Sequence, residues 1–283
     1  MVIGYSNTIM GRRKLPAREE AQRKRIMKTG KKNTNYNRSV CRALDVLEQF
    51  LLEDHEIGLT ELSRRLKLPK NNIFRLLATL QLRNYVSKDP VTERYQLGFM
   101  TVELAQKALQ QRGLGGARTV MERLVRACNE TTCVSIMSDY SVINLDSVEC
   151  DHNLRVMPAL GVQLPAYCTA PGKSLMAHFA DEAIAKYTSN NKFEKHTPHT
   201  ITDAESWKDQ LREIARQGYA VESEELNLGV TSVGAPIRDY TSRVIGAVSM
   251  LGPSQRFHRE RIEQELVPLL KRGAADISAA LGY

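Results

Sequence analysis

The most informative part of this chain is residues 58–81, which read GLTELSRRLKLPKNNIFRLLATLQ. Apolar residues recur at helical spacing in two runs, one before and one after the interruption at Leu68-Pro69. The second run predicts a helix over residues 70–81. Two amphipathic helices joined by a short turn form the core of a helix-turn-helix motif.

The flanking residues extend this pattern to a winged helix. Thr60 is a suitable N-cap for the second helix. Residues 85–87 and 94–97 are typical of short strands around a turn at 89–92. An earlier helix is predicted from its cap at Ser39 and from apolar residues at Val40, Ala43, Leu44, Leu47 and Leu51.

The charges of this region favour DNA binding. Residues 60–88 carry seven basic side chains and the single acid Glu61. The first turn of a recognition helix meets base edges in the major groove, where Asn can bind adenine and Arg or Lys can bind guanine or a phosphate. The alternative is that Asn71 and Asn72 only cap the helix. The predicted DNA contacts are Thr60, Lys70, Asn71, Asn72, Arg75, Lys88 and Arg94.

Length and composition limit the remaining possibilities. The chain has 283 residues, 42% hydrophobic and 25% charged, as expected for a globular protein of about two domains. Its longest mostly apolar stretch, residues 244–251, is too short to span a bilayer, and its N-terminus does not resemble a signal peptide. We therefore expect a cytoplasmic protein without membrane contact.

The net charge of +8 is unevenly distributed. Residues 1–38 contribute +9, residues 39–112 contribute +2 and residues 113–283 contribute −3. Such asymmetry indicates that one end meets a polyanion, although a solvated basic tail is the alternative. Residues 1–38 show no apolar periodicity, so we expect a flexible tail.

The second half of the chain predicts an α+β domain around an antiparallel sheet. Its helices and strands occur in separate runs, and an apolar helix over 100–111 precedes a glycine-rich hinge at 113–116. Pro268 can bend or split the last helix. The expected helices are 117–129, 172–179, 183–187, 204–217 and 259–280, and the expected strands are 133–138, 142–148, 154–157, 219–222, 230–237 and 243–251.

Other chemistry is poorly supported. The five cysteines form no CxxC pair, and the histidines lack metal-like spacing, so we expect no disulfide, metal or cofactor. Gly172-Lys173-Ser174 resembles the end of a phosphate-binding loop, but the required earlier glycine is Tyr167. Glu222, Glu224 and Glu225 could be paired acids, and we expect instead that they are solvated on a loop.

Several motifs in this order resemble the IclR family of bacterial transcriptional regulators. They include GLTELS at 58–63, LPK at 68–70, RLLATL at 75–80 and YQLG at 95–98. The second half adds GVQLP at 161–165, TAPGK at 169–173 and GYAV at 218–221. The family often has Ser-Thr where this chain has Asn71-Asn72, and Ala-Leu-Gly-Lys where it has Ala170-Pro171-Gly172-Lys173.

The resemblance covers nearly everything but the basic tail (1–38), which is longer than is usual in the family. It implies a non-enzymatic regulator with a winged-helix DNA-binding domain (39–98), a linker helix and hinge (99–116) and a GAF-like effector domain (117–283). It also implies a homodimer or homotetramer on a palindromic or repeated operator. The effector pocket that it implies is formed by Gly161, Val162, Glu222, Val230, Ser232, Ser249 and Leu251.

The residue types of that pocket give a mixed picture of the effector. Ser232, Ser249 and the backbone N–H groups near Gly161 could donate to a carboxylate, and a helix N-terminus near Gly172 would favour an anion. Glu222 would repel a carboxylate and suit a hydroxyl or amine. The family leads us to expect an organic, carboxylate or aromatic effector. The alternatives are a redox or small-molecule enzyme with incidental DNA binding, and a regulator that senses redox state through a cysteine.

Overall fold

A computed structural model of the protein describes residues 2–4, 37–52, 55–111, 114–191 and 193–283. The described chain divides into two compact units, residues 37–111 and residues 114–283, and the latter includes the short strand β1 (Val2–Gly4). The predicted flexible tail, apart from residues 2–4, 37 and 38, and the predicted hinge residue Gly113 lie outside the described residues. No described helix is long and apolar enough to cross a membrane.

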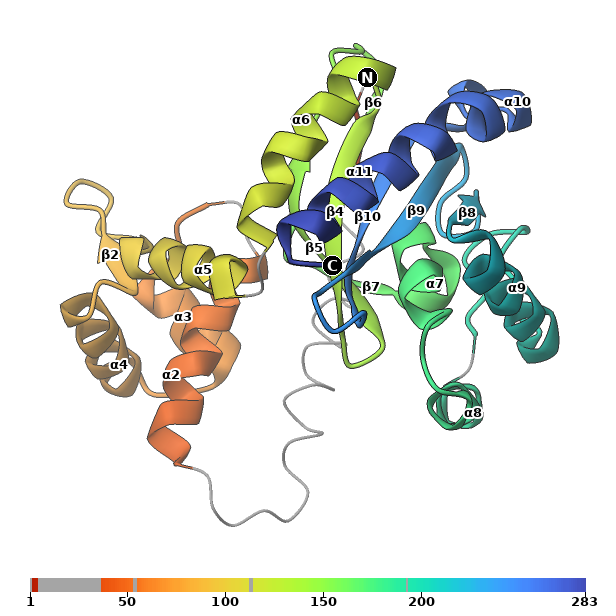
Figure 1. The fold of residues 1–283 in the computed structure, drawn as a ribbon. Helices are drawn as coiled ribbons and strands as arrows, with labels where there is room; N and C mark the ends of the chain where they lie inside the picture. The colour runs from red at the N-terminus through yellow and green to blue at the C-terminus, as the bar shows by residue number, and fades with distance from the viewer. Residues whose placement is uncertain (1, 5–36, 53–54, 112–113, 192) are drawn as a thin grey trace. The chain divides into compact units, whose positions relative to one another are not determined.

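The N-terminal unit is a winged helix-turn-helix, as the sequence predicted (Figure 1). Its helices α2, α3 and α4 contact one another around a core that includes Val46, Leu62, Ile73 and Leu77. Strands β2 and β3 pair antiparallel to form the wing. The elements are α2 (Arg38–Gln49), the 3-10 turn Phe50–Leu52, α3 (Leu59–Leu66), α4 (Lys70–Leu82), β2 (Val86–Lys88), β3 (Tyr95–Leu97) and α5 (Phe99–Gln111).

Two of the predicted helix caps are wrong. The side chain of Asn37, not Ser39, caps α2 by accepting from the backbone N–H groups of Ser39 and Val40. Helix α3 begins after Gly58, whose extended backbone serves as the N-cap without a side-chain hydrogen bond. Thr60 is therefore the second residue of α3, and its side chain is exposed.

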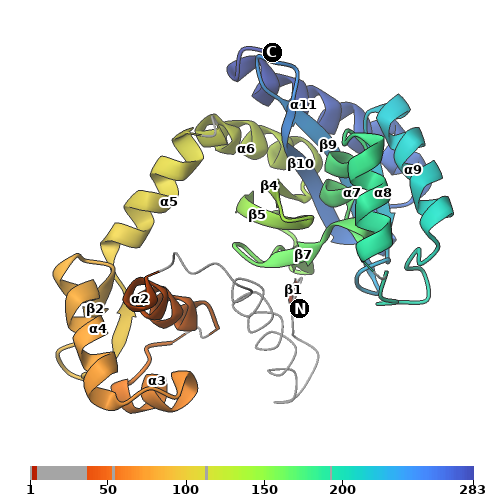
Figure 2. The same cartoon turned by 90° about the horizontal axis from the view of Figure 1, so that it is seen from below.

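The C-terminal unit is built on a six-stranded antiparallel sheet in the order β7-β5-β4-β10-β9-β8. Helices α6 and α11 cover one face of this sheet, and α7 and α9 lie on the other (Figures 1 and 2). The expected α+β architecture is confirmed. The strands are β4 (Thr131–Ser138), β5 (Ser141–Val148), β6 (Arg155–Met157), β7 (Gln163–Pro165), β8 (Ala220–Ser223), β9 (Val230–Arg238) and β10 (Val244–Pro253), and the helices are α6 (Ala117–Cys128), α7 (Ala170–Met176), α8 (Asp181–Asn190), α9 (Ala204–Gln217), α10 (Arg259–Arg261) and α11 (Val267–Ala280).

Side chains along the central strands point alternately to the two faces of the sheet, and each face has its own hydrophobic core. On β10, Val248 and Met250 point into the core under α6 and α11, whereas Ser249 and Leu251 point to the opposite face. The last predicted helix is interrupted by a π-helical turn, Ile262–Leu266, which ends two residues before Pro268. A proline removes a backbone donor and clashes with the preceding turn, which accounts for the interruption.

Candidate functional sites

The first candidate site is the outer face of α4. Ile73, Leu77 and Leu80 are buried against the rest of the unit, so the opposite side of the helix faces solvent. Lys70, Asn71, Asn72 and Arg75 are all exposed there. Within the described part of the chain, their side chains make no ion pair or hydrogen bond, so their donors are available to a ligand. Pro69 is the N-cap of α4, so neither asparagine caps it.

The wing residues are more engaged than the sequence suggested. Lys88 forms an ion pair with Glu93 at 3.4 Å, and its ammonium lies 5.9 Å from the centre of the Tyr95 ring. Arg94 donates to the carbonyl of Glu56 at 2.9 Å and pairs with Glu61 at 3.3 Å. Because Glu61 also binds Arg65, the one acid among the basic residues of this region is neutralised within the protein.

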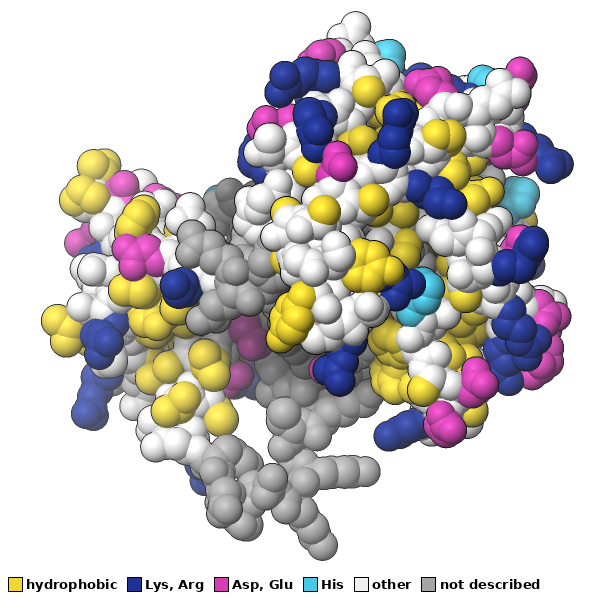
Figure 3. Space-filling view, in the orientation of Figure 1, with side chains coloured by type: hydrophobic (Ala, Val, Ile, Leu, Met, Phe, Trp, Pro, Cys, Tyr) yellow, Lys and Arg dark blue, Asp and Glu magenta, His cyan; other side chains and the backbone are white. Residues whose placement is uncertain are grey.

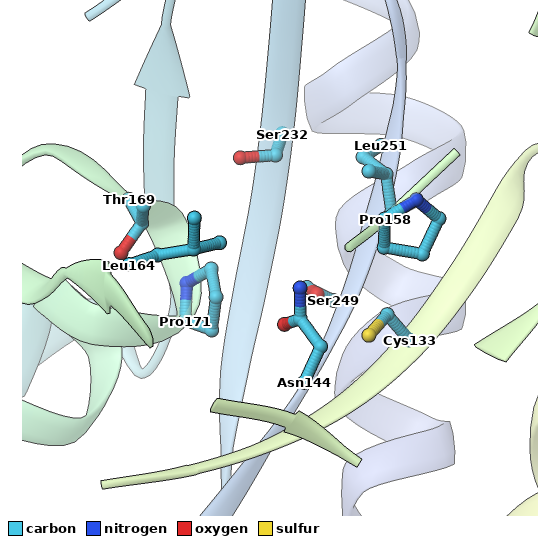
Figure 4. A pocket seen from close by; sticks show the side chains of 9 residues that line it. All are labelled: Cys133, Asn144, Pro158, Leu164, Thr169, Pro171, Ser232, Ser249 and Leu251. Atoms are coloured by element: carbon cyan, nitrogen blue, oxygen red, sulfur yellow. The ribbon is translucent and has the colours of Figure 1, made fainter. Parts of the chain in front are cut away.

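The second candidate site is a pocket in the C-terminal unit between β4, β5, β9, β10 and the start of α7 (Figure 4). Three predicted residues line it: Ser232, Ser249 and Leu251. The free space amounts to about 10 Å³, roughly what one water molecule needs. An organic molecule would fit there only in a widened pocket. The other lining residues are Cys133, Asn144, Pro158, Leu164, Thr169 and Pro171.

The remaining predicted pocket residues do not line this cavity. Val230 is buried in the core beside it, Val162 is half-buried and Gly161 is exposed. The N–H of Gly161 donates to the carbonyl of Asn144 at 2.8 Å, so this donor is already used. Glu222 lies behind the lining, where its carboxylate accepts from the Ser232 hydroxyl at 2.8 Å.

Asn144 is a lining residue that the sequence analysis did not single out. It is a buried polar residue in the middle of strand β5, where it follows the apolar Val142 and Ile143. Its Oδ1 accepts from Ser135 and its Nδ2 donates to the carbonyl of Ala159. The second hydrogen on Nδ2 remains for a ligand. A polar residue at an inward position of a strand was the available signal.

The glutamates expected to be solvated are largely buried, which corrects that expectation. Glu222 and Lys173 are fully inaccessible and Glu225 nearly so. The Lys173 ammonium donates to Glu225 at 2.5 Å and to the carbonyl of Val221 at 2.9 Å. Glu222 accepts from the backbone N–H of Glu225 at 2.7 Å. Burial nevertheless raises the pKa of Glu222 to about 7 and also raises the pKa of Glu225.

The expected anion site at the start of the pocket helix is also weaker than predicted. Helix α7 begins at Ala170 rather than at Gly172, and it is only seven residues long. Pro171, which has no N–H, is the residue that lines the pocket. Gly172 packs against the backbone of Ala166, where an added Cβ would lie 2.3 Å from the carbonyl oxygen.

The buried cysteines are poor candidates for redox chemistry. Burial raises the pKa of Cys133 to about 12 and that of Cys128 to about 11, and it raises the pKa of Cys168 further. Reactive cysteines are thiolates in accessible, electropositive surroundings. Cys133, the one that lines the pocket, is therefore a neutral wall residue at physiological pH.

Comparison with known proteins gives a consistent result. A family model described as bacterial transcriptional regulator IclR C-terminal matches residues 106–279, and the IclR helix-turn-helix domain matches residues 39–90. The HTH-type transcriptional regulator KdgR of Escherichia coli is 32% identical over 246 residues, covering 87% of this chain and 93% of KdgR.

Solved structures agree over the same length. A transcriptional regulator from Rhodococcus sp. RHA1 matches with a TM-score of 0.77 and 27% identity, covering 87% of this chain and 98% of the other. An IclR transcriptional regulator from Alicyclobacillus acidocaldarius matches with a TM-score of 0.76 and 28% identity, covering 87% and 100%. The relatives named in these comparisons are regulators rather than enzymes.

Proposed function

Because the chain belongs to the IclR family of bacterial transcriptional regulators, we propose that α4 reads an operator and that the pocket beside Ser232 holds the effector that controls this binding. The observation that carries the first part is the exposed, unpaired head of α4, with Lys70, Asn71, Asn72 and Arg75. Asn and Arg are the residues best suited to bidentate contacts with adenine and guanine.

We place the other predicted DNA contacts around this helix. Lys88 lies on the phosphate backbone or in the minor groove, together with Arg94 if its pair with Glu61 opens. Thr60, exposed at the start of α3, lies along the phosphate backbone of the DNA. Residues 1–38 add phosphate contacts that carry no sequence information. A protein that binds the bacterial chromosome acts in the cytoplasm, at the nucleoid.

A dimer or a pair of dimers fits the N-terminal unit. Val40 and Leu44 on α2 and Val102 on α5 are about half exposed, and Phe99 on α5 is more exposed still. Apolar side chains gathered on one small domain favour association. A dimer would present two α4 helices to successive major grooves, about 34–36 Å apart, and so would bind a palindromic or repeated site.

The pocket chemistry favours a small hydroxylated effector, with or without a carboxylate. Ser232 gives its hydrogen to Glu222, so its oxygen is left to accept from a ligand hydroxyl. Ser249 and the free hydrogen of Asn144 can donate. The effector widens the nearly filled pocket, and the resulting strain is passed to the DNA-binding unit through α5. A coupling of about 1–3 kcal/mol is enough for regulation.

The decisive experiment is a selection of bound sequences from random double-stranded DNA at physiological salt. An enriched motif with two related half-sites is expected, and it supplies the probe for a screen of small hydroxylated and carboxylated metabolites. Salt-sensitive binding without any enriched motif, both alone and with the metabolite pool present, would contradict the proposal.

A further inference from the structure

Phe74 is an exposed aromatic residue in the middle of the proposed reading helix. Its side chain is 55% accessible, whereas its neighbour Ile73 is fully buried. A single exposed apolar side chain is ordinary on a protein surface, so the position of Phe74 on the proposed reading helix is the informative feature. The N-terminal core closes without it.

The position of Phe74 connects it to the polar head of α4. It follows Asn71 by three residues, and residues at that spacing are neighbours on a helix surface. Arg75 and Ala78 are exposed beside it. Figure 3 shows basic (dark blue), acidic (magenta) and hydrophobic (yellow) side chains side by side on the visible face of this unit. Phe74 is thus an apolar contact surrounded by groups suited to a polyanion.

We propose that Phe74 contacts the 5-methyl group of a thymine in the major groove and so determines one position of the operator. The inference rests on the proposed DNA-reading role of α4. The occupant of this face is duplex DNA because the exposed charges flanking Phe74, Lys70 and Arg75, are basic and unpaired within the described chain. In the major groove the one apolar group on a base edge is the thymine methyl, and Phe is among the side chains that contact it.

The test removes the methyl group alone. Each thymine of the selected half-site is replaced in turn by uracil, which keeps all hydrogen bonds of the base pair. We expect one position at which wild-type affinity falls about fourfold, the value of one buried methyl group. Phe74→Ala should lose at least as much affinity for the thymine site and should not distinguish thymine from uracil there.

Matched controls separate this contact from general effects. Leu82→Ala removes another exposed apolar side chain of α4 and should keep the full thymine preference. Affinity for random DNA should be unchanged in both variants, because phosphate contacts are retained. Phe74→Leu should keep part of the preference.

Two results would overturn the inference. One is a wild-type protein that selects a motif but is insensitive to uracil at every position. The other is a Phe74→Ala variant that keeps the methyl preference. Both leave the regulator function intact. A wild-type protein that selects no motif at all would instead remove the function on which the inference rests.

Discussion

The side chain of Glu222 is fully buried, and donors from Ser232, Glu225 and Leu226 point at its carboxylate. Desolvation outweighs these hydrogen bonds and raises its pKa from 4.5 to about 7. Between pH 4.5 and about pH 7, the folded state therefore binds more protons than the unfolded state. The stability of the C-terminal unit should fall as pH rises through this window and should level off above pH 7.

The variant Glu222→Gln should remove this part of the pH dependence, roughly 2 kcal/mol between pH 5 and pH 8. The single tryptophan, Trp207, is fully buried in the same unit, so denaturant unfolding followed by its fluorescence reports on that unit. Glu182→Gln, at an exposed position of α8, should behave like the wild type. Parallel pH profiles for wild type and Glu222→Gln would contradict the prediction.

Arg75 is predicted to carry sequence preference rather than general affinity. Arg75→Ala should weaken binding to the selected operator by about 1–3 kcal/mol and change random-DNA binding much less. Arg83 is exposed just after α4 and serves as the matched basic control. Arg83→Ala should affect both DNAs equally, as a phosphate contact does. Titrations of labelled operator and scrambled duplex measure both, and equal losses for Arg75→Ala would refute the assignment.

At the scale of elements, a buried ion cluster ties the α10 region to the sheet. Glu130, the residue just before β4, is inaccessible and accepts from Arg256 at 2.6 Å and from Arg261 at 2.7 Å. Arg256 also donates to the carbonyl of Leu154, so the cluster holds three chain segments together. Removing the acid leaves the partly buried Arg256 without a carboxylate and leaves Arg261 with Glu265 alone.

Glu130→Ala should therefore destabilise the C-terminal unit by about 3 kcal/mol or more. Glu263→Ala breaks the exposed ion pair between Arg259 and Glu263, which are one helix turn apart. This variant should lower the stability of the unit by less than about 1 kcal/mol. Urea unfolding monitored at Trp207 compares the two variants directly. Similar losses in both would show that the cluster adds no more than a surface pair.

Local patterns predicted most of the elements. The apolar spacing of α3 and α4 and the alternation of β2 and β3 are complete within short windows, so those elements occur where expected. The strand β7 was not predicted, because three residues carry too little periodicity. Its pairing with β5 is a long-range contact. The N-caps of α2 and α3 are Asn37 and Gly58 rather than the predicted Ser39 and Thr60. Which residue becomes the cap depends on where the helix begins as well as on the residue type.

At the scale of the whole molecule, the basic tail and the reading helix should separate in their effects on binding. Removing residues 1–36 keeps Asn37, the cap of α2, and also removes the short strand β1, which pairs with β6. The truncated protein should show a smaller salt slope, reduced by about 0.9 for each phosphate that the tail neutralises, and should select the same motif. Binding measured across a salt series tests this. Disappearance of the operator motif on truncation would mean that the tail, not α4, reads the sequence.

Local sequence patterns were sufficient to establish the α+β class, the winged helix-turn-helix and the family. These depend on periodicity, turn residues and motif order, which are local properties. Ser232, Ser249 and Leu251, three of the residues that the family resemblance implies for the effector pocket, line the cavity of the C-terminal unit. Long-range packing was needed to show that Glu222, Glu225 and Lys173 form a buried cluster, that Asn144 joins the pocket, and that Pro171 replaces an N–H donor at its edge. The burial of a residue depends on which distant strands pair, and the energy of a charged group depends on its burial. Neither the burial nor the charge energy can therefore be calculated from the neighbours of a residue in sequence.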